Sequence, residues 1–321
     1  MTLKRLSLSL LLALPLIAHA DTGVTVSLDP PYPTPYQTVQ VTLTGYSFDL
    51  NVAQIVWSSR GKVLLSGLGK KTISLQLGDV GTSIPLSYTV TAAGGASTSG
   101  DTVLSPQSVD LLYESKESHT PPFYEGKALP GEGSVVRVAA FPSLSDGAGP
   151  IAPSNLSYAW YINEEYKENL SGVGKSSASV ALDYLQDSTD VRVLVRTPRG
   201  ATAEKSITIY PHDIIPLFYP YDDVLGVDLT MPFTRRIELA QEGTFSFEPY
   251  YFSRKNNLAS SASYLWYVDG LPVQTQEERM LAIRPDKEAS GRRTVTVVVD
   301  NTKRILQKTE ASLQVVFDTR K

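Results

Sequence analysis

The sequence predicts an all-β protein in which one sandwich-sized unit of about 100 residues occurs three times. Three observations lead to this prediction. The three tryptophans recur at intervals of 103 and 106 residues. Short runs of alternating apolar and polar residues lie on both sides of each tryptophan. The 21 Pro and 22 Gly residues are spread between these runs, as turn residues are.

The strands before and after each tryptophan have the period-two alternation of strands with one buried face. The preceding strands are expected at 39–43, 136–140 and 244–247, and the following strands at 88–90, 191–195 and 295–299. Turn residues and a closing strand come next, at 206–209 in the second unit and 312–317 in the third. Two strands joined in this way are the signal of a β-hairpin.

The tryptophans are expected on the third strand of each unit, packed between its two sheets. Three residues each follow their tryptophan by 31 positions and are expected in the core. The predicted core residues are Trp57, Trp160, Trp266, Tyr88, Val191 and Val297. About seven short strands in about 100 residues is the size of an immunoglobulin-like sandwich. The predicted fold is therefore three tandem immunoglobulin-like sandwiches arranged end to end.

The first twenty residues have the pattern of a secretory leader. Lys4 and Arg5 precede an apolar run at 6–17, and Ala18-His19-Ala20 is a cleavage motif. The run is shorter than the about 20 apolar residues that a membrane anchor needs. We therefore expect cleavage, no membrane span afterwards, and an extracellular, cell-surface or periplasmic location. The expected parts are a signal peptide at 1–20 and sandwiches at 21–104, 105–209 and 210–321, joined by short linkers.

Composition narrows the classes of function. The chain has no cysteine, so disulfides, thiolate metal sites and thiol nucleophiles are excluded. Without the leader's two cations, 27 basic residues stand against 33 acidic ones. No segment concentrates basic charge, so neither nucleic acid nor an anionic membrane surface is an expected partner.

The segment 169–177, Asn-Leu-Ser-Gly-Val-Gly-Lys-Ser-Ser, ends like a phosphate-binding loop. That loop requires a glycine where Asn169 stands, and it must join a strand to a helix. The first unit has a similar Gly-Leu-Gly-Lys segment at 67–70, at nearly the same distance from its tryptophan. Because the feature recurs in a β repeat, we interpret it as a turn and expect no nucleotide cofactor.

The second unit resembles PKD-type domains, bacterial relatives of the immunoglobulin fold found in surface proteins. The resemblance is carried by Tyr158-Ala-Trp160 and by the strand and turn at 191–200, and it lacks the family's acidic, Gly-rich turn after the tryptophan strand. The segment 109–130 also resembles one in uncharacterised exported proteins of candidate-phylum bacteria. These resemblances imply an architecture and a location, and they supply no activity.

Aromatic clusters near the junctions are the main candidates for a binding surface, because tyrosine-rich loops stack on sugars or anchor protein partners. The alternative is packing between neighbouring sandwiches or closure of their ends. The candidate residues are Phe123, Tyr124, Phe218, Tyr219, Tyr221, Tyr250 and Tyr251, and Tyr32 and Tyr36 also stand out in the first unit.

Catalytic and metal-binding patterns are weak. His119 and His212 lie in separate junctions and are interpreted as ordinary loop residues. The group Asp222, Asp223 and Asp228 could hold calcium, but its spacing matches no established loop, and a solvated acidic turn is the preferred interpretation. We therefore predict no catalytic residue, no metal and no cofactor.

The expected function is that of an exported, non-catalytic structural or adhesive protein. Its sandwiches would mediate protein–protein contacts in a cell-envelope or pilus-like assembly, with other envelope or surface proteins as partners. One alternative is a glycan-binding module that uses the aromatic loops. The other is a set of accessory domains in an extracellular enzyme system.

Overall fold

The computed structural model describes most of the chain between residues 23 and 317. The described ranges are 23–46, 49–146, 149–254, 258–259, 261–285, 291–304 and 306–317. Their regular elements are strands and two three-residue 3-10 turns, η1 (Pro153–Asn155) and η2 (Glu168–Leu170), which confirms the all-β prediction. None of the described helical segments is long and apolar enough to cross a membrane. The predicted leader at 1–20 lies outside the described residues.

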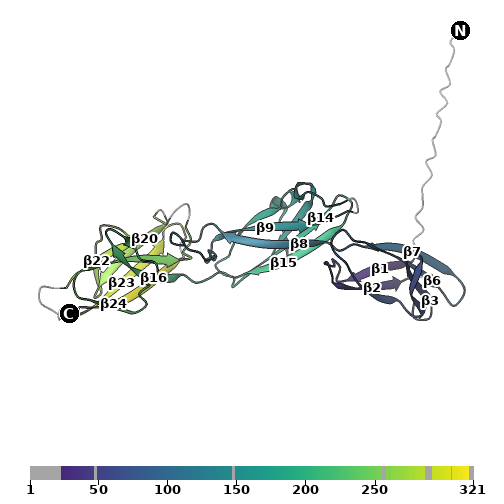
Figure 1. Ribbon diagram of the computed structural model, residues 1–321, viewed down its shortest axis with the longest axis horizontal. Helices are drawn as coiled ribbons and strands as arrows, with labels where there is room; N and C mark the ends of the chain where they lie inside the picture. Colours follow the sequence, from purple (N-terminus) through teal and green to yellow (C-terminus); the bar gives the residue numbers. More distant parts are fainter. Residues whose placement is uncertain are drawn as a thin grey trace, which may run out of the picture. The chain divides into compact units, whose positions relative to one another are not determined.

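The chain divides into two compact units, 1–106 and 107–321. The first is a sandwich of a three-stranded and a four-stranded sheet, in the orders β1–β2–β5 and β4–β3–β6–β7 (Figure 1). Its strands are β1 Val24–Asp29, β2 Thr38–Gly45, β3 Gln54–Ser59, β4 Lys62–Leu68, β5 Thr72–Gln76, β6 Ile84–Thr91 and β7 Ser97–Leu104. Along β2, Val39, Val41 and Leu43 are buried while the residues between them are more exposed. The period-two pattern therefore selects the face that forms the core.

The position of β4 distinguishes this sandwich from a constant-type immunoglobulin domain. In that domain the fourth strand belongs to the sheet of the first, second and fifth strands. Here β4 pairs with β3 and extends the opposite sheet. The change of sheet leaves β5 at one edge of the three-stranded sheet and β4 at one edge of the other.

The compact unit at 107–321 begins with the second sandwich, which is built from the sheets β13–β9–β8 and β11–β10–β14–β15. The short strand β12 also pairs with β10. The strands are β8 Ser108–Ser115, β9 Val135–Ser143, β10 Ser157–Ile162, β11 Glu165–Tyr166, β12 Gly172–Val173, β13 Ser177–Ala181, β14 Thr189–Arg196 and β15 Thr202–Ile209. The buried faces of these strands enclose one hydrophobic cluster.

The rest of the compact unit at 107–321 is the third sandwich, with the sheets β17–β16–β19–β22 and β18–β24–β23–β20–β21. The strands are β16 Ile215–Asp222, β17 Gly226–Val227, β18 Arg236–Leu239, β19 Gly243–Tyr250, β20 Ala262–Val268, β21 Leu271–Val273, β22 Met280–Ile283, β23 Gly291–Asn301 and β24 Lys308–Phe317. Strand β18 pairs in parallel with β24 and covers its edge. Each of the three sandwiches encloses its own hydrophobic cluster; the residue boundaries 104/105 and 209/210 stay predictions.

One hydrogen bond recurs around each buried tryptophan. The indole N–H donates to a backbone carbonyl two residues before the start of β5, β13 or β22, at 2.8–2.9 Å. The pairs are Trp57–Lys70, Trp160–Lys175 and Trp266–Glu278. All three indoles are at most 2% exposed. A buried N–H without an acceptor would cost free energy, so this bond lets a large apolar ring with a polar atom occupy the core.

Two of these carbonyls lie in the segments that resemble a phosphate loop. Gly69 and Gly174 have φ angles of +66° and +72°, a region that glycine occupies readily. A Cβ on Gly69 would lie 2.8 Å from the backbone oxygen of Asn51. The segment is therefore a tight turn that directs a carbonyl at the indole.

Strand register shows which of the three residues at this spacing lies opposite its tryptophan. Trp57 lies opposite Tyr88, and Trp266 lies opposite Val297. In the second sandwich Trp160 lies opposite Val193, whereas Val191 pairs with Ile162. The equal spacing of 31 residues therefore marks equivalent positions in the first and third sandwiches only. In the second sandwich the chain between the tryptophan and the strand that pairs with it differs in length.

Candidate functional site

The β8–β9 loop of the second sandwich, residues 116–134, lies against the third sandwich. The backbone N–H of His119 donates to the Phe252 carbonyl, and the Tyr251 N–H donates to the His119 carbonyl, both at 2.8 Å. A second contact is the donation of the His212 N–H to the Pro130 carbonyl, also at 2.8 Å. These backbone bonds join the β8–β9 loop of the second sandwich to the β19–β20 loop of the third sandwich and to the segment between β15 and β16.

A buried ionic cluster lies under this loop. Glu248 on β19 is 3% exposed, and its Oε2 atom lies 2.7 Å from Nε2 of His119, which is 5% exposed. The guanidinium of Arg279 donates to the same carboxylate at 3.1 Å and 3.3 Å. A buried carboxylate is tolerated only when it is paired and hydrogen-bonded, and here both partners are present.

Comparison of the repeats explains why Glu248 is unusual. Phe247 on β19 occupies the position that Leu43 occupies on β2. The N–H of each residue donates to the backbone carbonyl that directly follows the acceptor of the tryptophan N–H. Glu248 therefore matches Thr44 in the first sandwich, and Thr44 is exposed. The third sandwich thus places a carboxylate on an outer strand face that the β8–β9 loop covers.

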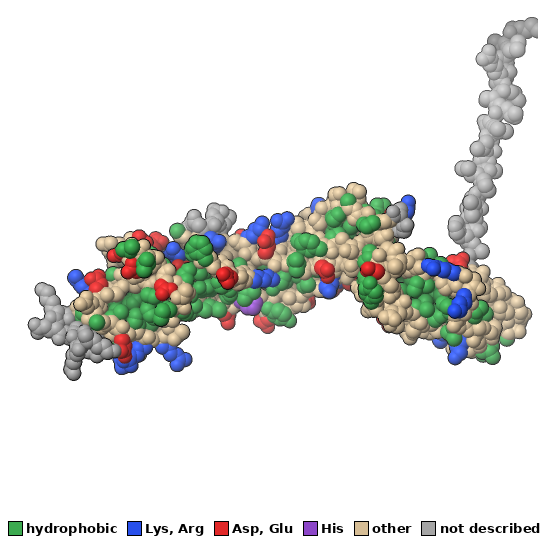
Figure 2. All heavy atoms as spheres, viewed as in Figure 1, with side chains coloured by type: hydrophobic (Ala, Val, Ile, Leu, Met, Phe, Trp, Pro, Cys, Tyr) green, Lys and Arg blue, Asp and Glu red, His purple; other side chains and the backbone are tan. Residues whose placement is uncertain are grey.

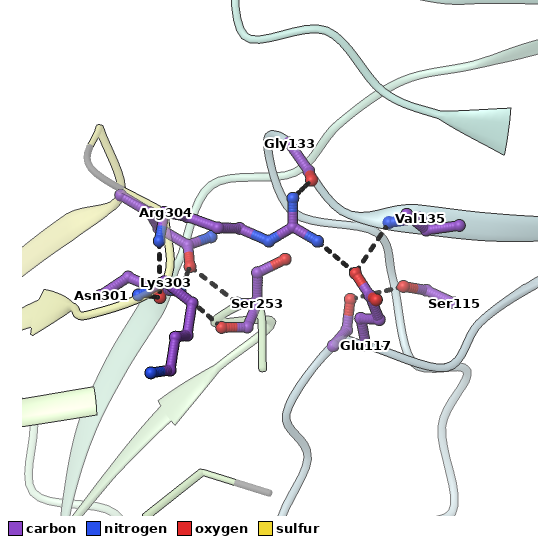
Figure 3. A network of polar contacts seen from close by, with 10 residues as sticks. Ser115, Glu117, Gly133, Val135, Ser253, Asn301, Lys303 and Arg304 are labelled. Atoms are coloured by element: carbon purple, nitrogen blue, oxygen red, sulfur yellow. Dashed lines mark hydrogen bonds and ion pairs between the residues drawn. The ribbon is translucent and has the colours of Figure 1, made fainter. Parts of the chain in front are cut away.

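A second polar network joins the same two sandwiches (Figure 3). Arg304, in the β23–β24 loop, donates from its guanidinium to the Gly133 carbonyl and to the Glu117 carboxylate. Glu117 also accepts from the Val135 N–H at 3.2 Å. Asn301 holds the base of the loop, because its Oδ1 accepts from the Arg304 N–H at 3.0 Å. Both ends of the β8–β9 loop are therefore tied to the third sandwich.

Several of the predicted aromatic residues line this junction. The hydroxyls of Tyr124 and Tyr251 lie 2.8 Å apart, as do those of Tyr219 and Tyr250. The ring of Tyr124 also meets that of Tyr250 edge-on, with centroids 5.6 Å apart. Burial and the hydrogen bond with Tyr124 raise the pKa of Tyr251 to about 12. Burial, together with the bond to Tyr250, raises the pKa of Tyr219 well above its ordinary value.

The exposed fraction separates the seven aromatic candidates. Phe218, Tyr219 and Tyr251 are buried, and Tyr124, Tyr221 and Tyr250 are partly buried. Phe218 belongs to the core of the third sandwich. Phe123 is 98% exposed. In the first sandwich Tyr32 is partly buried and Tyr36 is exposed.

The acidic group at 222–228 consists of capped turns. One Asp222 oxygen accepts from the N–H groups of Val224 and Leu225 at 2.8 Å and 2.9 Å, and these bonds lower the pKa of Asp222. Hydrogen bonds from the Thr230 hydroxyl and N–H lower the pKa of Asp228 in the same way. Within the described ranges, no three His, Asp or Glu side chains are grouped so as to hold a metal ion.

The interpretation of His119 as an ordinary loop residue is wrong, because its side chain is buried and paired with Glu248. The two residues are 129 positions apart, and no local pattern links them. A His–carboxylate pair can act as a base with its orienting group. Both residues of this pair are at most 5% exposed, and their contact joins the β8–β9 loop to β19.

The fold defines a tandem array of immunoglobulin-like β-sandwiches. No protein-family model matches the sequence, and no curated protein matches it. Among solved structures, the chain is similar to the central fibronectin-III array of RIM-binding protein, with 11% identity, a TM-score of 0.29, and coverage of 90% of this chain and 95% of that one. It is also similar to fibronectin(III)-like modules of Clostridium thermocellum CbhA, with 12% identity, a TM-score of 0.28, and coverage of 58% and 94%.

A third similar structure is described as showing how a 1.5-MDa bacterial ice-binding adhesin is retained on the host cell surface. The identity is 11%, the TM-score is 0.25, and the match covers 92% of this chain and 98% of that one. Because these scores are low, the assignment of the fold depends on the sheet topology of the chain itself.

Proposed function

We propose that the chain is an exported, non-catalytic structural or adhesive protein that mediates protein–protein contacts in a cell-envelope or pilus-like assembly. The observation that carries this proposal is the junction between the second and third sandwiches. Two ionic networks, backbone hydrogen bonds and packed tyrosines couple the two sandwiches there. Domains joined by a short linker alone would move relative to one another.

A coupled pair of sandwiches suits a structural role. Loops at its ends are held at a constant distance, so partners bound to them would also be held at a constant distance. The contacts that couple the pair are polar, and Glu248 and His119 among them are buried; leaving such a buried polar group without its partner costs about 1–3 kcal/mol. The coupling would therefore resist thermal motion of one sandwich relative to the other.

Surface chemistry supports proteins as the partners. On the face drawn in Figure 2, acidic and basic side chains are interspersed, without a continuous basic field. Nucleic acid and anionic membrane surfaces bind to such fields. Other envelope or surface proteins are therefore the proposed partners, and we propose no cofactor. The proposed export depends on the leader pattern at 1–20.

The burial of the aromatic residues bears on the glycan-binding alternative. Sugars stack on exposed ring faces. Of the seven candidate rings, six are buried or partly buried, and Tyr124, Tyr250 and Tyr251 contact one another. These contacts favour packing between sandwiches as the role of the cluster.

The proposal is tested by cross-linking the tagged, full-length protein in its native cells and identifying what is recovered with it. We expect envelope or pilus proteins in a constant ratio to the chain. Recovery of glycan without a stoichiometric protein partner would overturn the proposal in favour of the glycan-binding alternative. The purified protein is also assayed with hydrolase substrates, and turnover that survives repurification would refute the non-catalytic assignment.

A further inference from the structure

Four tyrosines at the junction between the second and third sandwiches form one connected cluster. Tyr124 lies in the β8–β9 loop, Tyr219 in β16, Tyr250 at the end of β19 and Tyr251 directly after it, in the β19–β20 loop. The ring of Tyr250 meets those of Tyr124, Tyr251 and Tyr219 at centroid distances of 5.6, 6.2 and 6.5 Å. These are distances of aromatic contact. The cluster therefore joins aromatic side chains of two different sandwiches.

Tyr124 and Tyr251 meet through their phenol groups. Their hydroxyl oxygens lie 2.8 Å apart, so one hydroxyl donates a hydrogen bond to the other. Each hydroxyl is bonded to a ring carbon whose two neighbours are the ortho carbons. The ortho carbons of both rings therefore lie close to the point where the two side chains meet.

Two phenols in this arrangement can be joined by oxidation. Loss of one electron and one proton converts each phenol into a neutral radical whose unpaired electron is shared with the ortho carbons. Two such radicals combine by forming a bond between one ortho carbon of each ring. The two hydrogens on these carbons then leave as protons, and the two oxygens take up protons, which restores both phenols. The product, dityrosine, carries its hydroxyls on the carbons next to the new bond, within hydrogen-bond distance of each other, as the hydroxyls of Tyr124 and Tyr251 are.

We propose that Tyr124 and Tyr251 are a site of oxidative cross-linking, at which a one-electron oxidant joins them as dityrosine. The oxidant is hydrogen peroxide acting through a haem peroxidase, which takes up the two electrons and two protons and releases two molecules of water. The link connects residues that are 127 positions apart and fixes the β8–β9 loop covalently to the third sandwich. Because the chain has no cysteine, a disulfide cannot make this connection.

The exposure of the cluster allows this oxidation. Tyr124 and Tyr250 are partly exposed, so an oxidant at the surface can remove an electron from either ring. Tyr251 is 7% exposed, and its ring contacts that of Tyr250. Rings in contact exchange electrons, so the buried phenol is oxidised through its neighbour.

The second phenol pair of the cluster differs in its backbone. The hydroxyls of Tyr219 and Tyr250 also lie 2.8 Å apart, but these residues belong to β16 and β19, which pair with each other in one sheet. Bond formation requires two rings to approach more closely than van der Waals contact, and residues in paired strands shift less than residues in loops. Tyr124 and Tyr251 both lie in loops, so we expect the link between them.

The test is oxidation of the mature chain, residues 21–321, by a haem peroxidase and hydrogen peroxide at a low protein concentration, where encounters between chains are rare. Monomers are isolated under denaturing conditions and digested, and fragmentation by mass spectrometry identifies the linked tyrosines. We expect a pair of peptides joined through Tyr124 and Tyr251, lighter by two hydrogen atoms than the two separate peptides.

The variants replace tyrosine by phenylalanine, which keeps the ring and removes the hydroxyl needed for the radical. Tyr124→Phe and Tyr251→Phe are each expected to abolish the linked pair. The control is Tyr210→Phe, which changes a tyrosine that is 59% exposed and outside the cluster, and it is expected to leave the yield unchanged. Thermal melting shows whether each variant is folded, and the two variants and the wild type each test the proposal separately.

Absence of the link from the oxidised wild type overturns the proposal, as does a link between Tyr219 and Tyr250 in its place. Coupling confined to exposed tyrosines such as Tyr36 and Tyr210 also overturns it, because exposure and not contact geometry would then select the reacting rings. The proposed envelope function is tested separately, by the partners recovered from cells, and does not depend on this result.

Discussion

Replacement of Glu248 by alanine tests whether the buried ionic cluster holds the second and third sandwiches together. The substitution removes a 2.7 Å contact with His119 and the bonds from Arg279. His119 would be left buried with neither ring nitrogen paired, since Nδ1 has no hydrogen-bond partner among the described residues. Breaking a buried ion pair by removing one member costs about 3–5 kcal/mol, and because Arg279 is 41% exposed we expect a loss of about 3 kcal/mol, at the lower end of that range. Against a domain stability of about 5–15 kcal/mol, this is a large loss.

The assay is native-state hydrogen exchange of the full mature chain. Amides of β19 and β23 report the unfolding of the third sandwich, and the Tyr251 amide, which donates to the His119 carbonyl across the junction, reports local opening. Opening of the junction would hydrate His119 and limit the global cost, so the two readouts are taken together. We expect the Tyr251 amide to exchange at least about 100-fold faster, corresponding to about 2.7 kcal/mol.

The matched control is Thr44→Ala, which changes the equivalent exposed position of the first sandwich. It is expected to change stability by less than about 0.5 kcal/mol. His119→Ala is expected to cost less than Glu248→Ala, about 1–3 kcal/mol, because Arg279 still pairs with the carboxylate. If Glu248→Ala shifts neither readout by more than Thr44→Ala does, the cluster does not stabilise the junction and the reasoning is refuted.

Three further predictions concern the turns, the tyrosines and the second network. Gly69→Ala should destabilise the first sandwich by about 1–3 kcal/mol more than Gly61→Ala, because both glycines have positive φ but only at Gly69 would the Cβ meet a backbone oxygen, at 2.8 Å; equal losses in urea denaturation would contradict this. The pKa of Tyr251 is raised from 10.0 to about 12, so the folded chain holds this proton more tightly than the unfolded chain does. Its contribution is complete below about pH 10 and is lost as the pH rises to about 12. Tyr251→Phe should therefore flatten the fall in stability over that range by up to about 1.4 kcal/mol per pH unit, and an unchanged slope would argue against it. Arg304→Ala should cost about 1–3 kcal/mol and Arg236→Ala, in a surface pair, under about 0.5 kcal/mol; similar melting temperatures would show that the Arg304 network adds nothing.

The strands were predictable because each depends on local pattern. Val39, Val41 and Leu43 alternate with polar residues, and a strand turns successive side chains to opposite faces. The central strands around Trp57, Trp160 and Trp266 could be placed for the same reason. Pairing between strands was not predictable at the level of single residues, as Val193 rather than Val191 opposite Trp160 shows. A change of two residues in a connecting segment shifts the register without altering the alternation.

The candidate site was predictable only in part. The aromatic residues near the junctions stood out by composition, but composition does not separate exposed Phe123 from buried Tyr251. His119 and Glu248 are far apart in the chain and belong to different sandwiches, and no spacing rule relates them. The parallel pairing of β18 with β24 was hidden for a similar reason, because an edge strand is chosen by the geometry of the folded sheet.

The sequence by itself determined that this protein is a cysteine-free, all-β repeat with a tryptophan in the core of each unit. Alternation, turn residues and recurrence depend on interactions between residues that are close in the sequence, so they can be recognised from short stretches of the chain. The tertiary structure alone decided which sheet β4 joins, which face of β19 the β8–β9 loop covers, and why a carboxylate and a histidine are buried together there. Those outcomes depend on burial and pairing between segments that are far apart in the sequence. These contacts form only when the strands have folded into sheets and the second and third sandwiches lie against each other.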